Sequence, residues 1–366
     1  MTIFFANPAY QFRAHKKDIE SAIERVINSN QFILGSEVNT FEENFAKFIG
    51  TKSAIGVANG TDAIEIAIEA LGLLPGDEII TVSHTAVATV AAIENVGVSP
   101  ILVDIDPDFF TLDPEKLNAA LSPKTRAVLI VHLYGQPGDL DSILNFCTKN
   151  NLYLIEDVSQ AHGAKFNNKR LGSFGDIACF SCYPTKNLGA IGDAGIITTN
   201  NLILAEKVKL IREYGWEKRY ESKIRGRNSR LDEIQAAILN VKLEFLDSDN
   251  QKRLDIANLY LTSISSKWVK LPKIRNLSHH VFHLFVIQTD FRDDLIEHLK
   301  RFEIIPGIHY PVPIHLQEAY KNRIKISSNL PVTEKISKNV LSLPIYPELQ
   351  IDEVKKVIEA VNSFRR

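Results

Sequence analysis

Residues 172–199, GSFGDIACFSCYPTKNLGAIGDAGIITT, decide the fold class of the chain. Two short apolar runs, 176–181 and 194–199, are typical of buried strands, and a loop of mostly small residues joins them. One lysine, Lys186, stands in that loop. Lysines usually extend into water, so a lysine among such small residues indicates a functional group. The alternative is a side chain that donates a hydrogen bond to a loop carbonyl.

Five further runs of similar length precede this pair and predict the rest of one sheet. They are residues 54–58, 78–82, 100–105, 127–133 and 152–157. Amphipathic stretches lie between most of the runs, and residues 61–71, TDAIEIAIEAL, keep their apolar side chains on one helical face. Strands that alternate with helices predict an α/β fold with a large, mostly parallel seven-stranded sheet covered by helices.

The pattern changes after about residue 250. An alternating strand and two amphipathic helices follow, at residues 280–289, 292–302 and 352–364. We therefore predict two domains. Residues 1–245, the N-terminal segment included, form the large α/β domain, and residues 246–366 form a smaller α+β domain. An amphipathic helix at 231–246 is expected to join them.

Composition places the chain among ordinary globular proteins and excludes several functional classes. The 366 residues are 45% hydrophobic and 23% charged, with a net charge of −2. This balance gives no electrostatic reason to bind nucleic acid. No apolar run is long enough to predict a membrane-spanning helix. The N-terminal residues lack the pattern of a signal peptide, so we expect a cytoplasmic protein.

Neither the cysteines nor the histidines predict a metal site. The cysteines are Cys147, Cys179 and Cys182. Their number is odd, and the pair spaced C-x-x-C lies across a strand end rather than at a helix start, so we interpret all three as small buried residues in a reducing compartment. His279, His280 and His283 cluster without supporting carboxylates or cysteines, so no metal is expected there.

The stretch ANGTDA at 58–63 follows the first predicted strand and opens the first predicted helix. Gly60 allows a tight turn, and the helix begins at Thr61 or Asp62. A helix N-terminus offers free N–H groups and the positive end of the helix dipole, so this turn can hold a phosphate. The alternative is a simple cap, in which Thr61 or Asp62 binds the backbone.

Further polar groups follow other strands of the predicted sheet. Asp157 ends the strand at 152–157, and Gln160 follows three residues later. A carboxylate at this end of a strand faces ligands in α/β proteins and can hold the protonated nitrogen of a pyridine ring, although it can also cap the following turn. Ser181 ends the next strand and can donate its hydroxyl to a phosphate. A pyridinium carboxylate combined with a Schiff-base lysine is what a pyridoxal phosphate enzyme needs, which favours the functional interpretation of Lys186.

The same motifs resemble those of a known family. Segments of the DegT/DnrJ/EryC1/StrS sugar aminotransferases are similar to GVANGTDAIEIAIEALGLLPGDEII, VHLYGQPGDLD, IEDVSQAHGA, the stretch 172–199, NSRLDEIQAAIL and GIHYPVPIHLQEAY. The resemblance runs from about residue 25 to the C-terminus. It implies fold type I, pyridoxal 5'-phosphate as the cofactor, and a homodimer whose active sites lie at the subunit interface.

The resemblance also implies a role for each motif. Lys186 would form the Schiff base with the cofactor, Asp157 would pair with the pyridine nitrogen, and Gln160 would lie near the ring hydroxyl. The phosphate would be held by Gly60, Thr61 and Ser181, together with Asn228 of RGRNSRLDE from the partner subunit.

One position departs from the family pattern. Many members read N-T-F or a similar aromatic where this chain has SHTAVAT, so the usual stacking aromatic falls at Ala86. We expect His84, two residues earlier, to stack on the cofactor ring instead. The alternative is a core histidine that is hydrogen-bonded to the backbone.

A resemblance to one subgroup narrows the expected reaction. SHTAVAT and YGWEKRY resemble enzymes that aminate C3 of a dTDP-linked 3-keto-6-deoxyhexose. We expect transfer from glutamate, giving a dTDP-3-amino-3,6-dideoxyhexose of the Fuc3N or Qui3N type for glycan biosynthesis. One alternative is a 4-aminotransferase acting on a UDP- or dTDP-linked 4-keto-6-deoxy sugar, and another is a non-catalytic regulatory protein that binds pyridoxal phosphate. The gluco or galacto configuration at C4 of the sugar stays open.

Four residues are expected to bind the substrate. Arg219 lies in the basic stretch 216–230, where the subgroup resemblance places it beside the nucleotide. His309 and Tyr310 match the family segment that lines the sugar pocket, and Tyr183 is placed to touch the hexose or the phosphates. Most other charges of 216–230 are interpreted as a solvated basic loop.

Overall fold

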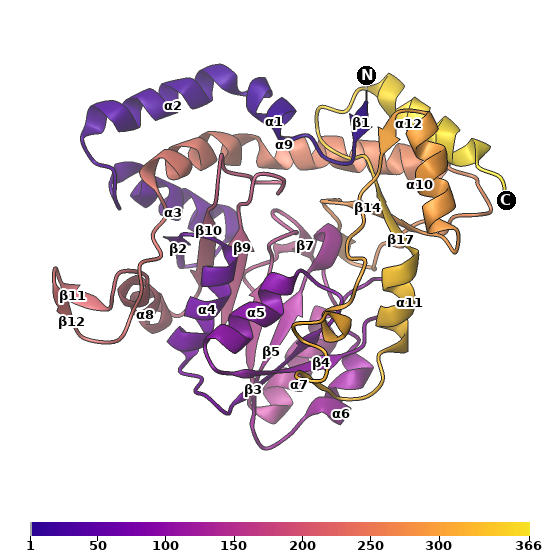
Figure 1. Ribbon diagram of the computed structural model, residues 1–366. Helices are drawn as coiled ribbons and strands as arrows, with labels where there is room; N and C mark the ends of the chain where they lie inside the picture. The colour runs from indigo at the N-terminus through magenta and orange to yellow at the C-terminus, as the bar shows by residue number, and fades with distance from the viewer. Residues whose placement is uncertain (1) are drawn as a thin grey trace.

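The computed structural model describes residues 2–366. A large sheet lies at the centre of the molecule, and helices pack against it (Figure 1). In spatial order its strands are β16 (Lys325–Ile326), β4 (Ser99–Val103), β3 (Glu78–Val82), β5 (Thr125–Val131), β6 (Tyr153–Asp157), β9 (Ile177–Ser181), β10 (Gly195–Thr199) and β2 (Ser53–Val57). β10 runs antiparallel to both of its neighbours, β9 and β2, and the other neighbouring pairs are parallel.

All seven predicted strands are present in this sheet, and a short eighth strand joins them. β16 contains only two residues and pairs with β4, where the ammonium of Lys325 lies 2.9 Å from a carboxylate oxygen of Glu78. A strand of two exposed residues has no alternating pattern, so the sequence does not predict it.

Helices follow the strands and cover the sheet. α4 (Gly60–Leu71) packs on β9 and β10, α5 (Val87–Asn95) on β4, α7 (Leu140–Asn150) on β6, and α8 (Leu202–Arg212) on α4 and β2. The strands β2, β3, β5, β6 and β9 all point in one direction. Their carboxyl ends and the first turns of α4 and α5 therefore meet at one edge of the sheet.

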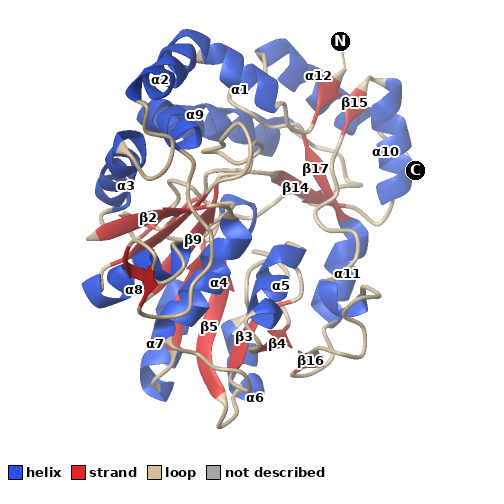
Figure 2. Ribbon diagram, turned by 60° about the vertical axis from the view of Figure 1, so that its left-hand side comes forward, coloured by secondary structure: helices blue, strands red, loops and turns tan. Residues whose placement is uncertain are grey.

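Helix α9 (Glu233–Ser263) is the longest helix of the described chain and runs beside α2 (Lys16–Ser29) and α3 (Ser36–Ile49) (Figures 1 and 2). Its first half packs against α2 and the main hydrophobic core, and its second half buries Tyr260 in a second hydrophobic core. The predicted helix at 231–246 is therefore the beginning of a longer one. The predicted boundary between residues 245 and 246 falls inside this continuous helix.

The second core is built from the C-terminal part of the chain. β14 (Phe285–Gln288) pairs antiparallel with β17 (Val340–Leu343), and α10 (Arg292–Arg301) and α12 (Ile351–Ser363) bury apolar residues in the same core. Figure 2 shows the β14–β17 pair apart from the strands of the large sheet. The two predicted C-terminal helices are thus confirmed within one residue at each end.

The N-terminal segment and one predicted strand differ from what the sequence predicts. β1 (Ile3–Phe4) pairs with β15 (Ile304–Ile305), so the first residues belong to the second core. The predicted strand at 280–289 forms a ladder only at 285–288. Upstream of it, the N–H groups of Val281 and Leu284 donate to the carbonyls of Gly135 (3.0 Å) and Tyr134 (3.3 Å) instead of a strand partner.

The remaining elements are short. They are α1 (Pro8–Ala14), α6 (Leu117–Ala120), α11 (Pro331–Asn339), β7 (Lys165–Phe166), β8 (Lys169–Arg170), β11 (Trp216–Lys218), β12 (Glu221–Ser222), β13 (Ser278–His279) and 3-10 turns at Pro114–Lys116, Leu133–Gly135 and Ile314–Leu316. β11 and β12 form an exposed hairpin that projects from the body at the left of Figure 1. Between residues 2 and 366, no helix is long and apolar enough to cross a membrane.

Candidate active site

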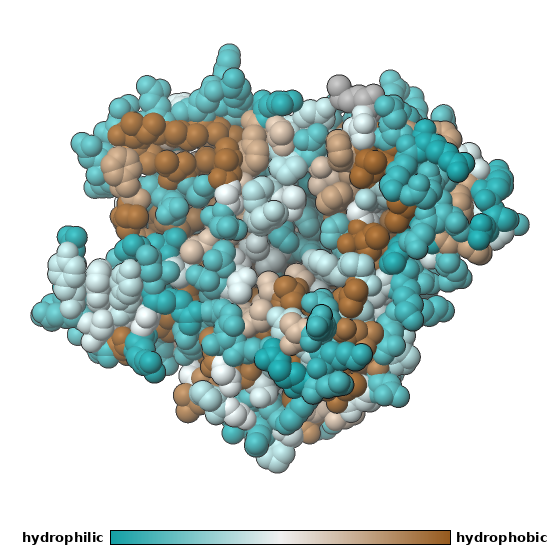
Figure 3. All heavy atoms as spheres, viewed as in Figure 1, coloured by the Kyte–Doolittle hydropathy of each residue, from teal (hydrophilic) through white to brown (hydrophobic). Residues whose placement is uncertain are grey.

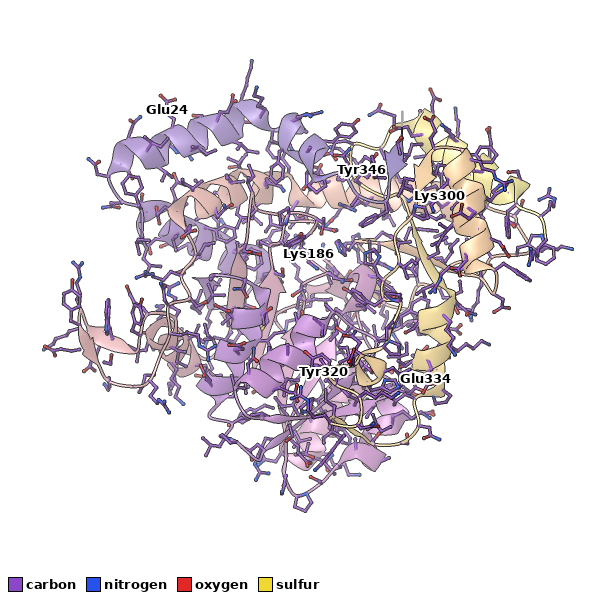
Figure 4. The ribbon with its side chains drawn as sticks, viewed as in Figure 1. Glu24, Lys186, Lys300, Tyr320, Glu334 and Tyr346 are labelled. Atoms are coloured by element: carbon purple, nitrogen blue, oxygen red, sulfur yellow. The ribbon has the colours of Figure 1, made fainter. Side chains whose placement is uncertain are left out.

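A cavity of ≈ 600 Å³ opens at the carboxyl edge of the sheet, beside Lys186. The lysine lies in the loop between β9 and β10, where its backbone N–H donates to the carbonyl of Tyr183 at 2.8 Å. Figure 4 shows Lys186 near the centre of the molecule, below α9. The residues predicted to bind the cofactor that line this cavity are Gly60, Thr61, Asp157, Gln160, Ser181 and Lys186. Folding thus brings together residues that are more than a hundred positions apart.

Asp157 is held by two hydrogen bonds at the end of β6. Its Oδ1 accepts from the N–H of Ser159 (3.1 Å), which is the turn cap considered as an alternative. Its Oδ2 accepts from the hydroxyl of Thr89 in the first turn of α5 (3.1 Å). The carboxylate therefore caps its turn and also lines the cavity, so the two interpretations are compatible. Thr89 is a site residue that the sequence patterns do not reveal.

The environment of Lys186 shifts its protonation toward the neutral amine. Burial lowers the pKa of its ammonium from 10.5 to about 8, and the nearby Asp157 carboxylate opposes the shift. The side chain keeps some exposed surface and lines the cavity. A lysine with this pKa supplies far more free amine near neutral pH than a solvated lysine does, as a Schiff-base nucleophile requires.

The N-terminus of α4 also lines the cavity. Asn59 caps the helix, because its Oδ1 accepts from the N–H of Asp62 at 2.8 Å. The cap is therefore not Thr61 or Asp62, and the Thr61 side chain is available to a ligand. A Cβ atom on Gly60 would lie only 2.5 Å from the Cβ of Ser181, so α4 begins directly against the end of β9. Free helix N–H groups with two hydroxyls beside them fit a phosphate group.

Gln160 lines the cavity, and two tyrosines hold its side-chain amide in place. Its Oε1 accepts from the N–H of Tyr134 (2.9 Å), and its Nε2 donates to the hydroxyl of Tyr310 (3.0 Å). Both atoms of the amide are therefore held by the protein. Tyr134 is a second residue that the patterns miss, although it stands in the quoted motif VHLYG, just after a buried strand. Its φ of 62° marks a tight turn there.

A second cavity of ≈ 330 Å³ adjoins the first and shares Gln160, Tyr183 and Lys186 with it. His309 and Tyr310 also line it. The predicted substrate residues Tyr183, His309 and Tyr310 therefore lie around Lys186 within one chain. Arg253 of α9 also lines this cavity and is a third residue without a sequence signal.

His84 does not lie where stacking on the cofactor would require. It is buried, and its Nε2 lies 2.7 Å from the hydroxyl of Tyr134 and its Nδ1 3.2 Å from the hydroxyl of Ser337. Ala86, and not His84, is among the residues that line the cavity of Lys186. Burial lowers the pKa of His84 to about 4, so the ring is neutral. His84 is thus a buried histidine bound to side chains, and the stacking interpretation is not supported.

Arg219 and Asn228 lie away from the Lys186 cavity of their own chain. Arg219 is exposed near the β11–β12 hairpin, with its guanidinium 5.1 Å from the centre of the Tyr220 ring. Asn228 is exposed and forms an isolated β-bridge with Glu213. Neither lines the Lys186 cavity, so any role there requires a second subunit.

The histidine cluster and the cysteines take ordinary packing roles. Nδ1 of His280 accepts from the N–H of Phe282 (3.0 Å), and Nδ1 of His283 lies 3.1 Å from Oδ1 of Asn187. In the described part of the chain, no three His, Cys, Asp or Glu side chains are grouped as metal ligands. The cysteines are buried free thiols, namely Cys147, Cys179 and Cys182.

Comparison with known proteins agrees with this geometry. Residues 13–362 match the model of the DegT/DnrJ/EryC1/StrS aminotransferase family. The chain is 46% identical over 350 residues to the dTDP-3-amino-3,6-dideoxy-alpha-D-galactopyranose transaminase of Aneurinibacillus thermoaerophilus, and the match covers 96% of each chain. It is 42% identical over 359 residues to the Pleiotropic regulatory protein of Geobacillus stearothermophilus, covering 97% of this chain and 96% of that one. The crystal structure of S. venezuelae DesV in complex with a ketimine intermediate superposes with a TM-score of 0.96 at 39% identity, covering 99% of this chain and 98% of that one.

Proposed function

Because the chain belongs to the DegT/DnrJ/EryC1/StrS aminotransferase family, it is a pyridoxal phosphate aminotransferase, and we propose that it transfers the amino group of glutamate to C3 of a dTDP-3-keto-6-deoxyhexose. One observation carries the proposal: Lys186, Asp157 and the N-terminus of α4 line a single cavity. The product is a dTDP-3-amino-3,6-dideoxyhexose for glycan biosynthesis. The relative that acts on the galacto sugar supports the Fuc3N type, and the Qui3N type is the second candidate.

The chain's own residues divide the work of this reaction. When bound, pyridoxal phosphate supplies the carbonyl that receives the amino group and the ring that accepts electrons. The Asp157 carboxylate, fixed by Thr89 and Ser159, holds the proton on the pyridine nitrogen. Gly60, Thr61 and Ser181 hold the phosphate. The C3 atom of the keto sugar gains a hydrogen in this reaction, and the Nζ atom of Lys186, neutral in part near pH 8, would take a proton from the bound cofactor as general base and deliver it to C3 as general acid.

A homodimer completes the proposed site. Exposed apolar side chains gather over α2 and the start of α9, as Figure 3 shows at its upper left. They include Ile27, Phe32, Ile33 and Ile234. Isolated chains seldom leave such a patch in water. Pairing through this face would let the projecting hairpin carry Arg219 to the nucleotide diphosphate, and Asn228 to the phosphate, of the partner's cavity.

The thiols support the proposed compartment. Three buried cysteines without a disulfide suit a reducing environment, so we place the reaction in the cytoplasm.

Product analysis tests the function. The purified protein is incubated with pyridoxal phosphate, glutamate and either dTDP-3-keto-6-deoxyglucose or its galacto epimer, and the product is identified by NMR. The proposal expects an amino group at C3 and release of 2-oxoglutarate. No product from either 3-keto sugar, with an amino group at C4 in a parallel incubation with dTDP-4-keto-6-deoxyglucose, would replace it with the 4-aminotransferase alternative.

The regulatory alternative is favoured by one similar protein, the Pleiotropic regulatory protein. It predicts cofactor binding without release of 2-oxoglutarate from any keto sugar. Lys186→Ala is the matched control, because it should abolish turnover while leaving the sugar-binding surfaces in place.

A further inference from the structure

The smaller cavity beside Lys186 has the character of an anion site. Its lining includes Lys186, Arg253, His283 and His309, but no Asp or Glu among the described residues. In contrast, Asp157, Asp62, Glu65 and Asp193 line the larger cavity. The two cavities therefore differ in charge although they share Lys186.

Arg253 is buried in this lining and forms no ion pair among the described residues. The residue is 4% exposed, and its Nη1 donates to the carbonyls of Ile345 (3.0 Å) and Phe282 (3.4 Å). Within residues 2–366 its Nε has no hydrogen-bond partner. The charges of Asp249 and Glu348 act on it, but neither carboxylate forms an ion pair with it. A buried guanidinium without an ion pair costs free energy, and an anion in the adjoining cavity would offset that cost.

The other basic groups of the cavity do not provide a permanent charge. Burial lowers the pKa of His309 to about 4 and that of His283 well below its ordinary value, so both rings are neutral. Lys186 titrates at about 8. Arg253 keeps a pKa of about 10 despite its burial and stays charged at neutral pH. The fixed charge of this cavity therefore resides on Arg253.

We propose that Arg253 binds the α-carboxylate of the amino donor in the cavity beside Lys186. This inference rests on the proposed function, because the donor's nitrogen has to reach the place where Nζ of Lys186 acts, and its α-carboxylate is one carbon away from that nitrogen. A volume of ≈ 330 Å³ suits an amino acid better than a nucleotide sugar. A guanidinium recognises a carboxylate through paired N–H donors.

The simpler role of Arg253 is structural, as a tie between the carbonyls of Phe282 and Ile345. Two amino donors that differ in one carboxylate distinguish the two roles. L-glutamate has an α-carboxylate and a distal carboxylate, whereas 4-aminobutyrate lacks the α-carboxylate and keeps the distal one. The rate of the donor half-reaction is followed by the absorbance of the bound cofactor, in the wild type and in Arg253→Gln.

The proposal expects Arg253→Gln to lose about a hundredfold in kcat/KM with L-glutamate and almost nothing with 4-aminobutyrate. Arg253→Lys should recover part of the loss, because it keeps the charge but not the paired donors. The control is Lys252→Met, which removes an exposed charge from the residue that precedes Arg253 on α9. The ammonium of Lys252 lies 2.9 Å from a carboxylate oxygen of Asp249. An equal loss with both donors would overturn the proposal.

A binding measurement keeps this inference separate from the sugar reaction. Glutarate has no amino group, so calorimetry reports its affinity for the holoenzyme without turnover. Its dissociation constant should rise at least tenfold in Arg253→Gln and stay unchanged in Lys252→Met. Unchanged glutarate affinity in Arg253→Gln, or an equal loss in the keto-sugar half-reaction, contradicts the proposal. If instead the wild type aminates no keto sugar while glutarate binding still depends on Arg253, the proposed sugar substrate fails and the carboxylate site stands.

Discussion

The first residue of α4, Gly60, lies so close to Ser181 at the end of β9 that a Cβ atom would approach the serine Cβ to 2.5 Å and its Cα to 3.0 Å. The contact involves backbone and a short side chain, neither of which can turn aside. It brings the free N–H groups of a helix and a strand-end hydroxyl to one point of the cavity. The phosphate end of the site therefore depends on the absence of a side chain at position 60.

Gly60→Ala should weaken cofactor binding. The added methyl group forces α4 and β9 apart, which costs about 1–3 kcal/mol and displaces the phosphate donors. We expect the dissociation constant for pyridoxal phosphate to rise at least about tenfold in an absorbance titration of the apoprotein. Gly72→Ala at the other end of α4 is the control, because its φ of +82° is strained for alanine but no atom lies within 4 Å of the new Cβ. Equal cofactor affinities in both variants would refute the explanation.

Thr89→Val should lower turnover more than substrate binding. The change removes the hydroxyl that donates to Oδ2 of Asp157, and hydrogen bonds to charged groups contribute about 1.5–3 kcal/mol. We expect kcat to fall about ten- to hundredfold, with KM for the sugar little changed. Thr81→Val is a matched control on β3, since its buried hydroxyl has no partner within the described residues. A Thr89→Val enzyme with wild-type kcat would show that this hydrogen bond does not support Asp157.

Lys186 should make the stability of the apoprotein depend on pH. Its pKa in the folded state is about 8, below the ordinary 10.5, so between these values the unfolded chain binds more protons than the folded one. The free energy of unfolding therefore rises with pH in this window, by at most about 3 kcal/mol in total, and the cost of the buried charge is fully present below pH 8.

The measurement compares wild type and Lys186→Met by urea denaturation of the apoproteins from pH 7 to pH 10. The variant should be the more stable protein at pH 7, and its advantage should shrink as the pH rises through 8. Buried Lys242, with a pKa of about 7, titrates in both proteins and cancels in the difference. A difference that is constant with pH would mean that Lys186 is not desolvated.

The sequence predicts those parts of the molecule that depend on neighbouring residues. Strand runs and helical faces follow short-range periodicity, so all seven main strands and the helix that starts beside Gly60 are found where the patterns place them. Lys186, Asp157 and Ser181 stand at or next to strand ends, and parallel strands bring such ends to one edge. Their convergence follows from topology, which the alternation of elements already predicts.

The rest of the site depends on contacts that no local pattern encodes. The sequence of the helix around Arg253 gives no sign that this arginine is buried. It is buried because the segments around Phe282 and Ile345 pack over it. His84 turns away from the cavity because Tyr134 and Ser337 offer its nitrogens partners, and Ser337 is distant in the chain. Which of several competing hydrogen bonds a side chain forms depends on partners that come together only in the folded state.

Mixing variants should reveal whether two subunits share each site. Lys186→Ala inactivates the active site of the subunit that carries the change. The double variant Arg219→Ala/Asn228→Ala should instead inactivate the active site of the subunit that pairs with it. If the hairpin acts across the interface, half of the dimers re-formed from an equal mixture are hybrids with one intact site, and activity should return to about a quarter of wild type. A mixture of Lys186→Ala with Asp157→Asn is the control, because both residues line one cavity of one chain, so no intact site can form. No gain in the first mixture, or an equal gain in the control, would show that Arg219 and Asn228 do not act in the active site of the partner subunit.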